Sequence, residues 1–312
     1  KVIQVALVGA GSFAKGMHLP NMSKMEDKFK LRAVQNRTGF NAKATADQYG
    51  AKYASTDLNE ILEDSEVDLV MIATRHDSHG EIVLKSLKAG KNVFVEKPLC
   101  VNKEELEEIK SFYDSEGDKP VLMVGYNRRF STYAQEIKKH TENRINPLFM
   151  RYRMNAGYIP LDHWVHEDGG RIIGEGCHII DLMGFFAGSK AVSVSNEKMS
   201  PNNEKYSSHD NTSIAIRYED GSVAVIDYFA CGAKGISKEN LEVHFDNKSI
   251  IMDDYKEMTS YGLSIKNIST VTSQKGQFEE LEALHECLTN KKGSWPIEFD
   301  DLIQTSEISF LI

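Results

Sequence analysis

The 312-residue sequence is poor in cysteine and lacks long apolar runs. Its four cysteines (Cys100, Cys177, Cys231 and Cys287) include no C-x-x-C pair. This spacing excludes the usual thiolate zinc site, provides no disulfide framework, and makes a reducing cytoplasm the expected compartment. No apolar stretch reaches the roughly 18 residues that span a bilayer, so we expect no membrane association.

The sequence also lacks an excess of positive charge. Its formal net charge is -9 and its pI is near 5.6. A protein of this charge is not expected to bind nucleic acid through the phosphate backbone. The chain begins at Lys1 rather than Met and stops inside a helical pattern, "SEISFLI". Two explanations of these termini stay open: the ends of the chain are missing, or the sequence is part of a longer fused chain. The first strand begins too close to residue 1 for a secretion signal to precede it in this sequence.

The first part of the chain alternates apolar strand patterns with amphipathic helical patterns. A chain of this length usually forms two domains, and this alternation predicts a parallel sheet covered by helices on both faces. We therefore expect an α/β fold with a Rossmann domain, a doubly wound parallel sheet, over 1–127. The expected strands are "VIQVALVGAG", "KLRAVQNR", "DLVMIAT", "NVFVEKP" and "VLMVGYN".

After residue 127 the pattern changes to long strands joined by turns. "EDGS" and "FDNKS" are typical of hairpins, where Asp-Gly and Asn tolerate the positive φ required. We predict an α+β domain over 128–312 with a large, open, mostly antiparallel sheet, used for substrate binding and oligomerisation. Helices expected over 278–292 and at the chain end should pack back on the body. Because a large apolar sheet face rarely stays exposed to water, we expect a homodimer or homotetramer that forms through this sheet.

A glycine-rich turn follows the first strand. In "VALVGAGSFAKGMHLP", Gly9 and Gly11 permit a tight turn, and Ala14 stands where the third small residue of G-x-G-x-x-G/A belongs. The helix that follows offers its N-terminal amides to a pyrophosphate. The turn therefore predicts NAD(P) binding.

The end of the second strand bears on the choice between NAD and NADP. NAD sites usually present an acidic residue there, whereas "AVQNRTG" offers Asn36, Arg37 and Thr38 without a carboxylate. This favours NADP over NAD, with Arg37 on the 2′-phosphate or the adenine. Arg37 as a plain surface charge stays open as the alternative.

Other polar residues follow the later strands of the same sheet. Ligands bind beyond the carboxyl ends of the strands of such a sheet. Lys97 lies at such an end, so its ammonium is expected near the nicotinamide and a substrate hydroxyl. The predicted cofactor-binding set is Gly9, Gly11, Ser12, Phe13, Ala14, Asn36, Arg37, Thr38, Thr74, His76, His79, Glu96, Lys97, Asn127 and Arg128.

Four segments carry a resemblance to a known family. "GAGSFAKGMHLP", "VEKPL", "VGYNRRF" and "GGRIIGEGCHIIDLMGFFAG" occur in the order seen in the Gfo/Idh/MocA family of NAD(P)-dependent oxidoreductases, and the resemblance covers essentially the whole chain. It is nearest to the branch also found fused to zinc-dependent alcohol-dehydrogenase-like domains. The resemblance implies hydride transfer at a secondary hydroxyl or keto group of a sugar, sugar derivative or nucleotide-sugar.

The resemblance also implies the catalytic residues Lys97, His178 and Glu175. In "GEGCHIID", the residues Glu175, His178 and Asp181 are three apart, so on a helix they share one face. The family places its catalytic histidine where His178 stands. Many members carry Asp four residues earlier, where this chain has Gly174, so Glu175 either substitutes for that Asp or only tunes the local charge. Histidine suits the proton exchange, and the roles of Lys97 and His178 are interchangeable at this stage.

Sugar-binding residue types are dense in "RMNAGYIPLDHWVHEDGG". His163, His166 and Asp168 lack a supporting ligand cluster, so no metal site is predicted. Two alternatives to the dehydrogenase stay open: a non-catalytic NAD(P)-binding sensor, and an epimerase or glycosidase that uses the cofactor transiently. The predicted substrate-binding residues are Lys97, Asn155, Tyr158, His163, Trp164, Glu175, His178 and Asp181.

Overall fold

The computed structural model describes residues 1–167, 169–265, 267–290 and 295–312, and the chain divides into two compact units. The first comprises residues 1–125 and 277–303, and the second comprises residues 126–276 and 304–312. The predicted domain boundary at residue 127 lies close to residues 125 and 126, where the chain first passes from one unit to the other. The second unit is not the continuous 128–312 segment expected from the sequence, because a helical segment near the chain end packs with the first unit.

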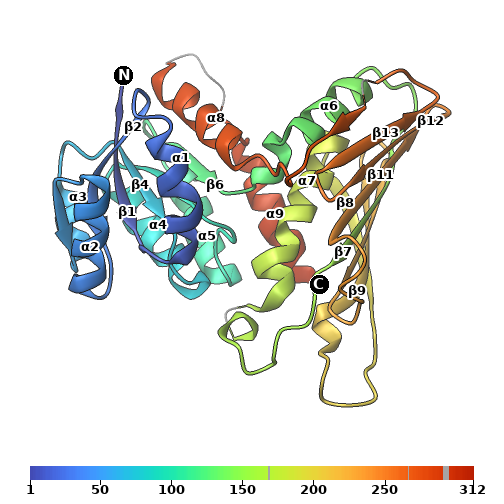
Figure 1. Ribbon diagram of the computed structural model, residues 1–312, viewed down its shortest axis with the longest axis horizontal. Coiled ribbons are helices and arrows are strands. Elements are labelled where there is room, and N and C mark those ends of the chain that lie inside the picture. Colours follow the sequence, from blue (N-terminus) through green and yellow to red (C-terminus); the bar gives the residue numbers. More distant parts are fainter. Residues whose placement is uncertain (168, 266, 291–294) are drawn as a thin grey trace. The chain divides into compact units, whose positions relative to one another are not determined.

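The first unit contains a six-stranded parallel sheet in the order β3-β2-β1-β4-β5-β6 (Figure 1). This order reverses between β1 and β4, as in a doubly wound fold. The central strands are apolar because both sheet faces are buried, as the near-continuous apolar runs predicted. The strands are β1 (Ile3–Val8), β2 (Phe29–Gln35), β3 (Tyr53–Ser55), β4 (Leu69–Ile72), β5 (Asn92–Val95) and β6 (Leu122–Val124).

The helices of the first unit follow the strands in alternation. The sequence predicted the α-helices but not the short elements η1 and η2, and it missed the three-residue strand β3, which is too short to show a pattern. The helical elements are η1 (Ala14–His18, a π-helix), α1 (Leu19–Ser23), α2 (Gly39–Tyr49), α3 (Leu58–Glu63), η2 (His76–Ser78), α4 (His79–Lys88), α5 (Lys103–Asp114) and α8 (Gln277–Thr289). Residues 291 and 292, predicted as the end of this last helix, lie outside the described residues.

The second unit contains an eight-stranded sheet in the order β14-β13-β12-β11-β7-β10-β9-β8 (Figure 1). All pairs are antiparallel except β7 with β10. The predicted hairpins form, and the turn between β11 and β12 places Asp246 and Asn247 at positive φ. The strands are β7 (Phe149–Asn155), β8 (Ala191–Lys198), β9 (Asn211–Tyr218), β10 (Val223–Phe229), β11 (Glu239–Phe245), β12 (Lys248–Asp253), β13 (Glu257–Tyr261) and β14 (Ile268–Ser269).

Helices cover one face of this second sheet. Residues alternate between buried and accessible along β7, β9, β10 and β11, and the buried ones pack against the helices. In Figure 1 the opposite face of the sheet carries no helix among the described residues. The helical elements of this unit are η3 (Asn127–Phe130), α6 (Thr132–Thr141), η4 (Trp164–His166), η5 (Ile172–Gly176, a π-helix), α7 (Cys177–Ala187), η6 (Ser208–Asp210) and the C-terminal part of α9 (Phe299–Leu311).

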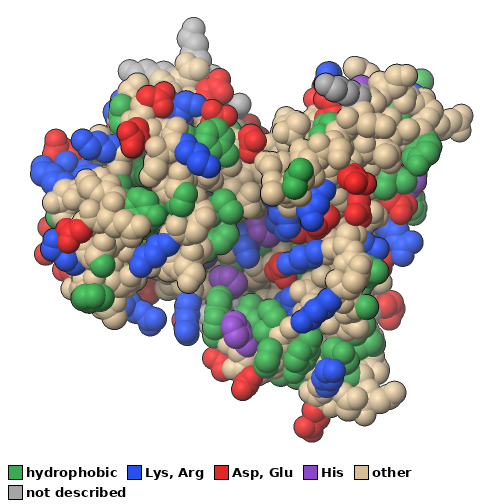
Figure 2. Space-filling view, in the orientation of Figure 1, with side chains coloured by type: hydrophobic (Ala, Val, Ile, Leu, Met, Phe, Trp, Pro, Cys, Tyr) green, Lys and Arg blue, Asp and Glu red, His purple; other side chains and the backbone are tan. Residues whose placement is uncertain are grey.

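The distribution of surface charge and the lengths of the helices agree with what the composition led us to expect. Figure 2 shows Lys and Arg side chains interspersed with Asp and Glu over the drawn face of the first unit, without a broad patch of one sign. Within the described ranges, no helix is both long enough and apolar enough to cross a membrane.

Candidate cofactor and catalytic residues

The glycine turn lies at the point where the strand order of the first sheet reverses. Gly9 follows β1 at φ +92°, and a Cβ there would lie 2.7 Å from the Ala73 carbonyl oxygen and 2.8 Å from Thr74 Cγ2. Glycine is therefore required by both the backbone and the neighbouring strand end. The turn thus brings Gly9 and Thr74 together, as their places at strand ends indicated.

At Gly11, packing against neighbouring atoms does not require a glycine. A Cβ on Gly11 would meet no atom within 4 Å among the described residues. Ser12 and Phe13 beside it are exposed, whereas Ala14 is buried at the start of η1. This is the open space that close approach of a ligand to the backbone needs, so the turn fits the pyrophosphate of a dinucleotide. The π-helical turn of η1 is a distortion often found at functional sites.

Lys97 follows β5 and is half-buried at the same end of the sheet. Its charge acts on His76, which follows β4: burial first, then the Lys97 ammonium, lowers the pKa of His76 to about 3. His76 is therefore neutral at physiological pH. The carboxyl ends of β4 and β5 thus bring Lys97 close enough to His76 for its charge to act on the imidazole.

His79 joins the loops after β4 and β5. Its Nδ1 lies 2.6 Å from the Pro98 carbonyl oxygen and its Nε2 lies 3.2 Å from that of Thr74. Burial lowers its pKa, and the two carbonyls and Glu96 oppose this shift only in part. The ring is completely buried, so His79 fixes the loops rather than reaching a ligand. This geometry argues against our prediction of a cofactor contact for His79.

Glu96 points into the first unit. Its Oε1 lies 2.6 Å from Nε2 of His18, which is completely buried at the end of η1. Sequence reasoning did not assign a role to His18, although the motif "GMHLP" contains it. A charged residue can therefore end this buried strand, because the Glu96 carboxylate accepts a hydrogen bond from a buried imidazole.

Residues after β2 are accessible. Arg37 and Thr38 are exposed, and the Asn36 side-chain amide donates to Thr38 Oγ1 at 3.1 Å. Asn41, in the first turn of α2, accepts a hydrogen bond from the Lys15 ammonium, and its Nδ2 donates to the Ala10 carbonyl at 2.9 Å. The start of α2 is thus tied to the glycine turn.

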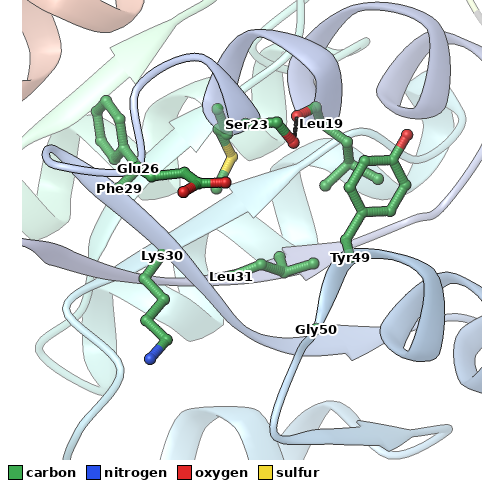
Figure 3. A pocket seen from close by; sticks show the side chains of 9 residues that line it. Leu19, Ser23, Glu26, Phe29, Lys30, Leu31, Tyr49 and Gly50 are labelled. Atoms are coloured by element: carbon green, nitrogen blue, oxygen red, sulfur yellow. Dashed lines mark hydrogen bonds between the residues drawn. The ribbon is translucent and has the colours of Figure 1, made fainter.

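The described structure also has a cavity of about 320 Å³ on the flank of the first unit (Figure 3). None of the predicted site residues lines it. Its walls come from α1, β2 and the end of α2, away from the carboxyl ends of the strands. The lining residues are Leu19, Met22, Ser23, Glu26, Phe29, Lys30, Leu31, Tyr49 and Gly50.

In the second unit, Glu175 is held by three donors. Its carboxylate accepts from Tyr228 Oη at 2.6 Å, Lys238 Nζ at 2.8 Å and Arg171 Nη2 at 3.1 Å. Burial alone would raise the pKa of Glu175, but these partners outweigh it and lower the pKa to about 2. Glu175 is therefore a fixed anion at neutral pH, not a proton-exchanging group. Arg171 was missed, although its place four residues before Glu175 is a recognisable helix spacing.

Asp181 has other hydrogen-bond partners than Glu175. Asp181 is buried and accepts two hydrogen bonds from Arg129, at 2.6 and 3.0 Å. His178 lies at the second residue of α7, with its ring edge-on to Tyr126 at 6.3 Å between centroids. Because the π-helical turn η5 precedes α7, the α-helical spacing rule does not hold across Glu175 and His178. The predicted substrate contact of Asp181 is not supported by this geometry.

Asn127 and Arg128 are likewise engaged inside the second unit. Asn127 Nδ2 donates to the Lys275 carbonyl at 2.7 Å. Arg128 donates to both carboxylate oxygens of buried Glu239, at 2.7 and 2.9 Å. Because this guanidinium is buried and paired with a carboxylate, the predicted cofactor contact of Arg128 is not supported.

The residues predicted to contact sugar lie in different surroundings. Asn155 is buried, and its Nδ2 donates to the Ala233 carbonyl at 2.8 Å. Tyr158 and His163 are exposed in the loop that follows β7, and Trp164 is half-buried. Asp168 lies outside the described residues.

Comparison with known proteins covers both units. Residues 3–126 match the model of an oxidoreductase family with an NAD-binding Rossmann fold, and residues 146–251 match the GFO/IDH/MocA C-terminal domain. The chain is 24% identical to myo-inositol 2-dehydrogenase of Thermotoga maritima over 262 residues, covering 82% of this chain and 77% of the relative.

A second relative and a solved structure agree with these matches. The chain is 27% identical to the NAD⁺-dependent scyllo-inositol 2-dehydrogenase of Bacillus subtilis over 231 residues, covering 72% of this chain and 66% of the relative. The fold resembles that of a levoglucosan dehydrogenase in complex with NADH and levoglucosan, with a TM-score of 0.83, 20% identity, and coverage of 100% of this chain and 96% of that one. The chain therefore belongs to the Gfo/Idh/MocA family of oxidoreductases, whose N-terminal domain has an NAD-binding Rossmann fold.

Proposed function

We propose that the chain is an NAD(P)-dependent dehydrogenase acting on a secondary hydroxyl or keto group of a sugar, sugar derivative or nucleotide-sugar. The observation that carries this proposal is the position of Lys97 beside a neutral His76, on the sheet end that also holds the Gly9 turn. The names of the relatives, which act on inositols, support a polyhydroxylated ring as substrate.

The reaction needs a group that moves a proton at the substrate oxygen. A bound nicotinamide supplies or accepts the hydride. His178 takes the hydroxyl proton during oxidation and returns it during reduction, while the Lys97 ammonium holds and polarises that oxygen. His76 does not compete for this proton, because its pKa of about 3 makes it a poor base near neutral pH. Glu175 supplies a constant negative charge. We retain Asn155, Tyr158, His163 and Trp164 as proposed sugar contacts.

A spectrophotometric assay tests the proposal. The chain is incubated with NAD⁺ or NADP⁺ and a panel of inositols, neutral sugars and nucleotide-sugars, and the absorbance of the reduced nicotinamide is followed. Accumulation of reduced cofactor with one substrate supports the dehydrogenase. Tight cofactor binding without turnover of any substrate favours the non-catalytic sensor. Conversion of a sugar without net cofactor reduction indicates an epimerase or glycosidase.

The preference for NADP gives a separate prediction. Arg37 is exposed after β2, and no carboxylate occupies residues 36–38. If Arg37 pairs with the 2′-phosphate, Arg37→Ala should lower kcat/KM with NADP roughly tenfold to a hundredfold, since hydrogen bonds to charged groups contribute about 1.5–3 kcal/mol. The value with NAD should change little. Lys30→Ala, which removes an exposed cation from the same strand, is the matched control. Equal effects on both cofactors would leave Arg37 as an ordinary surface charge.

We also propose that two copies of the chain associate through the helix-free face of the second sheet. Val225 lies half-buried on that face, opposite Ala215 of the neighbouring strand. A buried carboxylate at a copy–copy contact is strongly unfavourable. Val225→Glu should therefore convert a dimer or tetramer to monomer in light scattering, whereas Thr259→Glu, near the sheet margin, should not. A wild-type protein that is already monomeric would reject the proposal.

A further inference from the structure

Three buried side chains of the first unit converge on the end of β5. His18, Glu96 and Glu280 each offer a ring nitrogen or carboxylate oxygen, and these atoms all lie within 4.8 Å of one another. His18 is 0%, Glu96 9% and Glu280 1% exposed. They come from η1, the residue after β5, and the first turn of α8. The cluster therefore joins three elements directly beside Lys97.

Two members of this cluster keep a buried polar atom without a hydrogen-bond partner among the described residues, Glu280 at Oε2 and His18 at Nδ1. Glu280 is the carboxyl group of the two, whereas Glu96 accepts a hydrogen bond from His18 Nε2. The N-terminal end of α8 favours a negative charge slightly, but the burial penalty of a carboxylate is several times larger. Burial, then the charges of Glu96 and Glu279, raise the pKa of Glu280 well above its ordinary value. The neutral acid is the favoured form.

A metal ion is the other species that could stabilise two buried carboxyl groups. Zinc holds its ligand atoms about 2.0–2.3 Å from the ion, which places neighbouring ligands about 3.3 Å apart or more. The His18 Nε2 to Glu96 Oε1 distance of 2.6 Å is too short for two ligands of one ion and is that of a direct hydrogen bond. A proton fits this arrangement better than a metal.

We propose that Glu280 is kept as a neutral carboxylic acid that donates to Glu96, directly or through one water molecule, and that this clamp positions Lys97. A separation within 4.8 Å can be bridged by a side-chain rotation or one water molecule. Glu96 lies directly against Gly125, where a Cβ would come within 3.0 Å of its Oε1, so the glycine leaves room for the carboxylate at this place. With His18 on one side and Glu280 on the other, the residue before Lys97 is held from two elements. The role for Lys97 rests on the function proposed above, whereas the protonation of Glu280 does not.

Thermal unfolding tests the protonation. The folded state keeps a proton on Glu280 that the unfolded state releases above about pH 4.5, so this residue lowers stability as pH rises. Glu280→Gln removes that titration. Its Tm should match the wild type near pH 5 and exceed it by several degrees near pH 8. Glu279→Gln, the neighbouring and less buried acid, should show no such pH-dependent gain. An equal Tm difference at both pH values would overturn the neutral acid.

Two further measurements complete the test. Infrared difference spectra of wild type against Glu280→Gln should show the C=O band of a protonated carboxyl near pH 8, and its absence would contradict the proposal. Zn²⁺ alone, added to the wild type, should leave Tm unchanged; a rise that Glu280→Gln abolishes would identify a metal site instead.

The positioning role has its own readout. Glu280→Met keeps the side-chain volume but cannot donate, so kcat should fall about tenfold with the alkaline limb of the pH–rate profile shifted, while the cofactor dissociation constant changes less than about twofold. Wild-type kcat and pH profile in this variant would overturn the positioning role. If Lys97→Met itself stays active, the proposed function fails, but the unfolding and infrared results still decide the state of Glu280.

Discussion

Replacing Lys97 with methionine is expected to lower kcat roughly 10²–10⁴-fold while the cofactor dissociation constant stays within about threefold. Lys97 is half-buried at the carboxyl end of β5, and its charge acts on His76. Methionine preserves the length of the side chain but cannot hold or polarise a substrate oxygen. Cofactor binding should be retained, because the variant leaves unchanged the glycine turn and the strand ends that form the proposed cofactor-binding site.

The remaining histidines near Lys97 should not rescue the variant. Burial is the larger cause of the low pKa of His76, and the Lys97 charge is the smaller. Removing the lysine therefore leaves His76 mostly neutral and still a poor acid at neutral pH. His79 remains bonded to the Pro98 carbonyl. The loss of activity should persist across the accessible pH range.

His178→Asn provides the second arm of the experiment. If His178 exchanges the proton, this variant should lose one limb of the pH–rate profile, whereas Lys97→Met should keep the limb at a reduced rate. The reverse pattern would exchange the two roles. Lys85→Met, which removes an exposed lysine paired with Glu81 on α4, controls for loss of a surface charge. Near-normal turnover in both Lys97→Met and His178→Asn would refute the catalytic assignment.

The fold of the first unit could be predicted because its signals are local. Apolar runs that end in glycine or a charged residue mark strands buried on both faces, and the carboxyl ends of such strands meet at one edge. Gly9 and Thr74, which both follow strands, therefore lie together at one edge of the sheet. A strand as short as β3 carries too few residues for a period to appear.

The errors concern contacts between residues far apart in sequence. Arg128 pairs with Glu239, 111 residues away, and Glu175 with Lys238, 63 residues away. No spacing rule connects positions so far apart. Arg128, which follows a predicted strand, was therefore assigned to the cofactor, whereas it forms an ion pair in the protein interior.

The strongest stability effect is expected from Arg128→Met. Glu239 is completely buried and is satisfied by Arg128, by Lys275 Nζ at 2.8 Å and by the Tyr152 hydroxyl at 2.5 Å. Removing one partner of a buried ion pair leaves the buried carboxylate less well compensated and costs about 3–5 kcal/mol of unfolding free energy. Tm should fall by roughly 10 °C. Arg151→Met, which breaks an exposed arginine–aspartate pair on β7, should cost less than about 1 kcal/mol.

The pH dependence of this loss identifies its cause. In the wild type, burial would raise the pKa of Glu239, but Arg128 and Lys275 outweigh it and hold the pKa well below its ordinary value. Stability from this pair is therefore present above the unfolded-state pKa of about 4.5 and is lost as the pH falls further. In Arg128→Met, burial opposes a weaker set of partners, so the Glu239 pKa rises and the folded state takes up a proton more readily. The difference in unfolding free energy between the two proteins, measured with denaturant, should thus be widest near pH 7 and narrow as the pH falls through the raised Glu239 pKa of the variant. A difference independent of pH would mean that Arg128 contributes packing rather than charge.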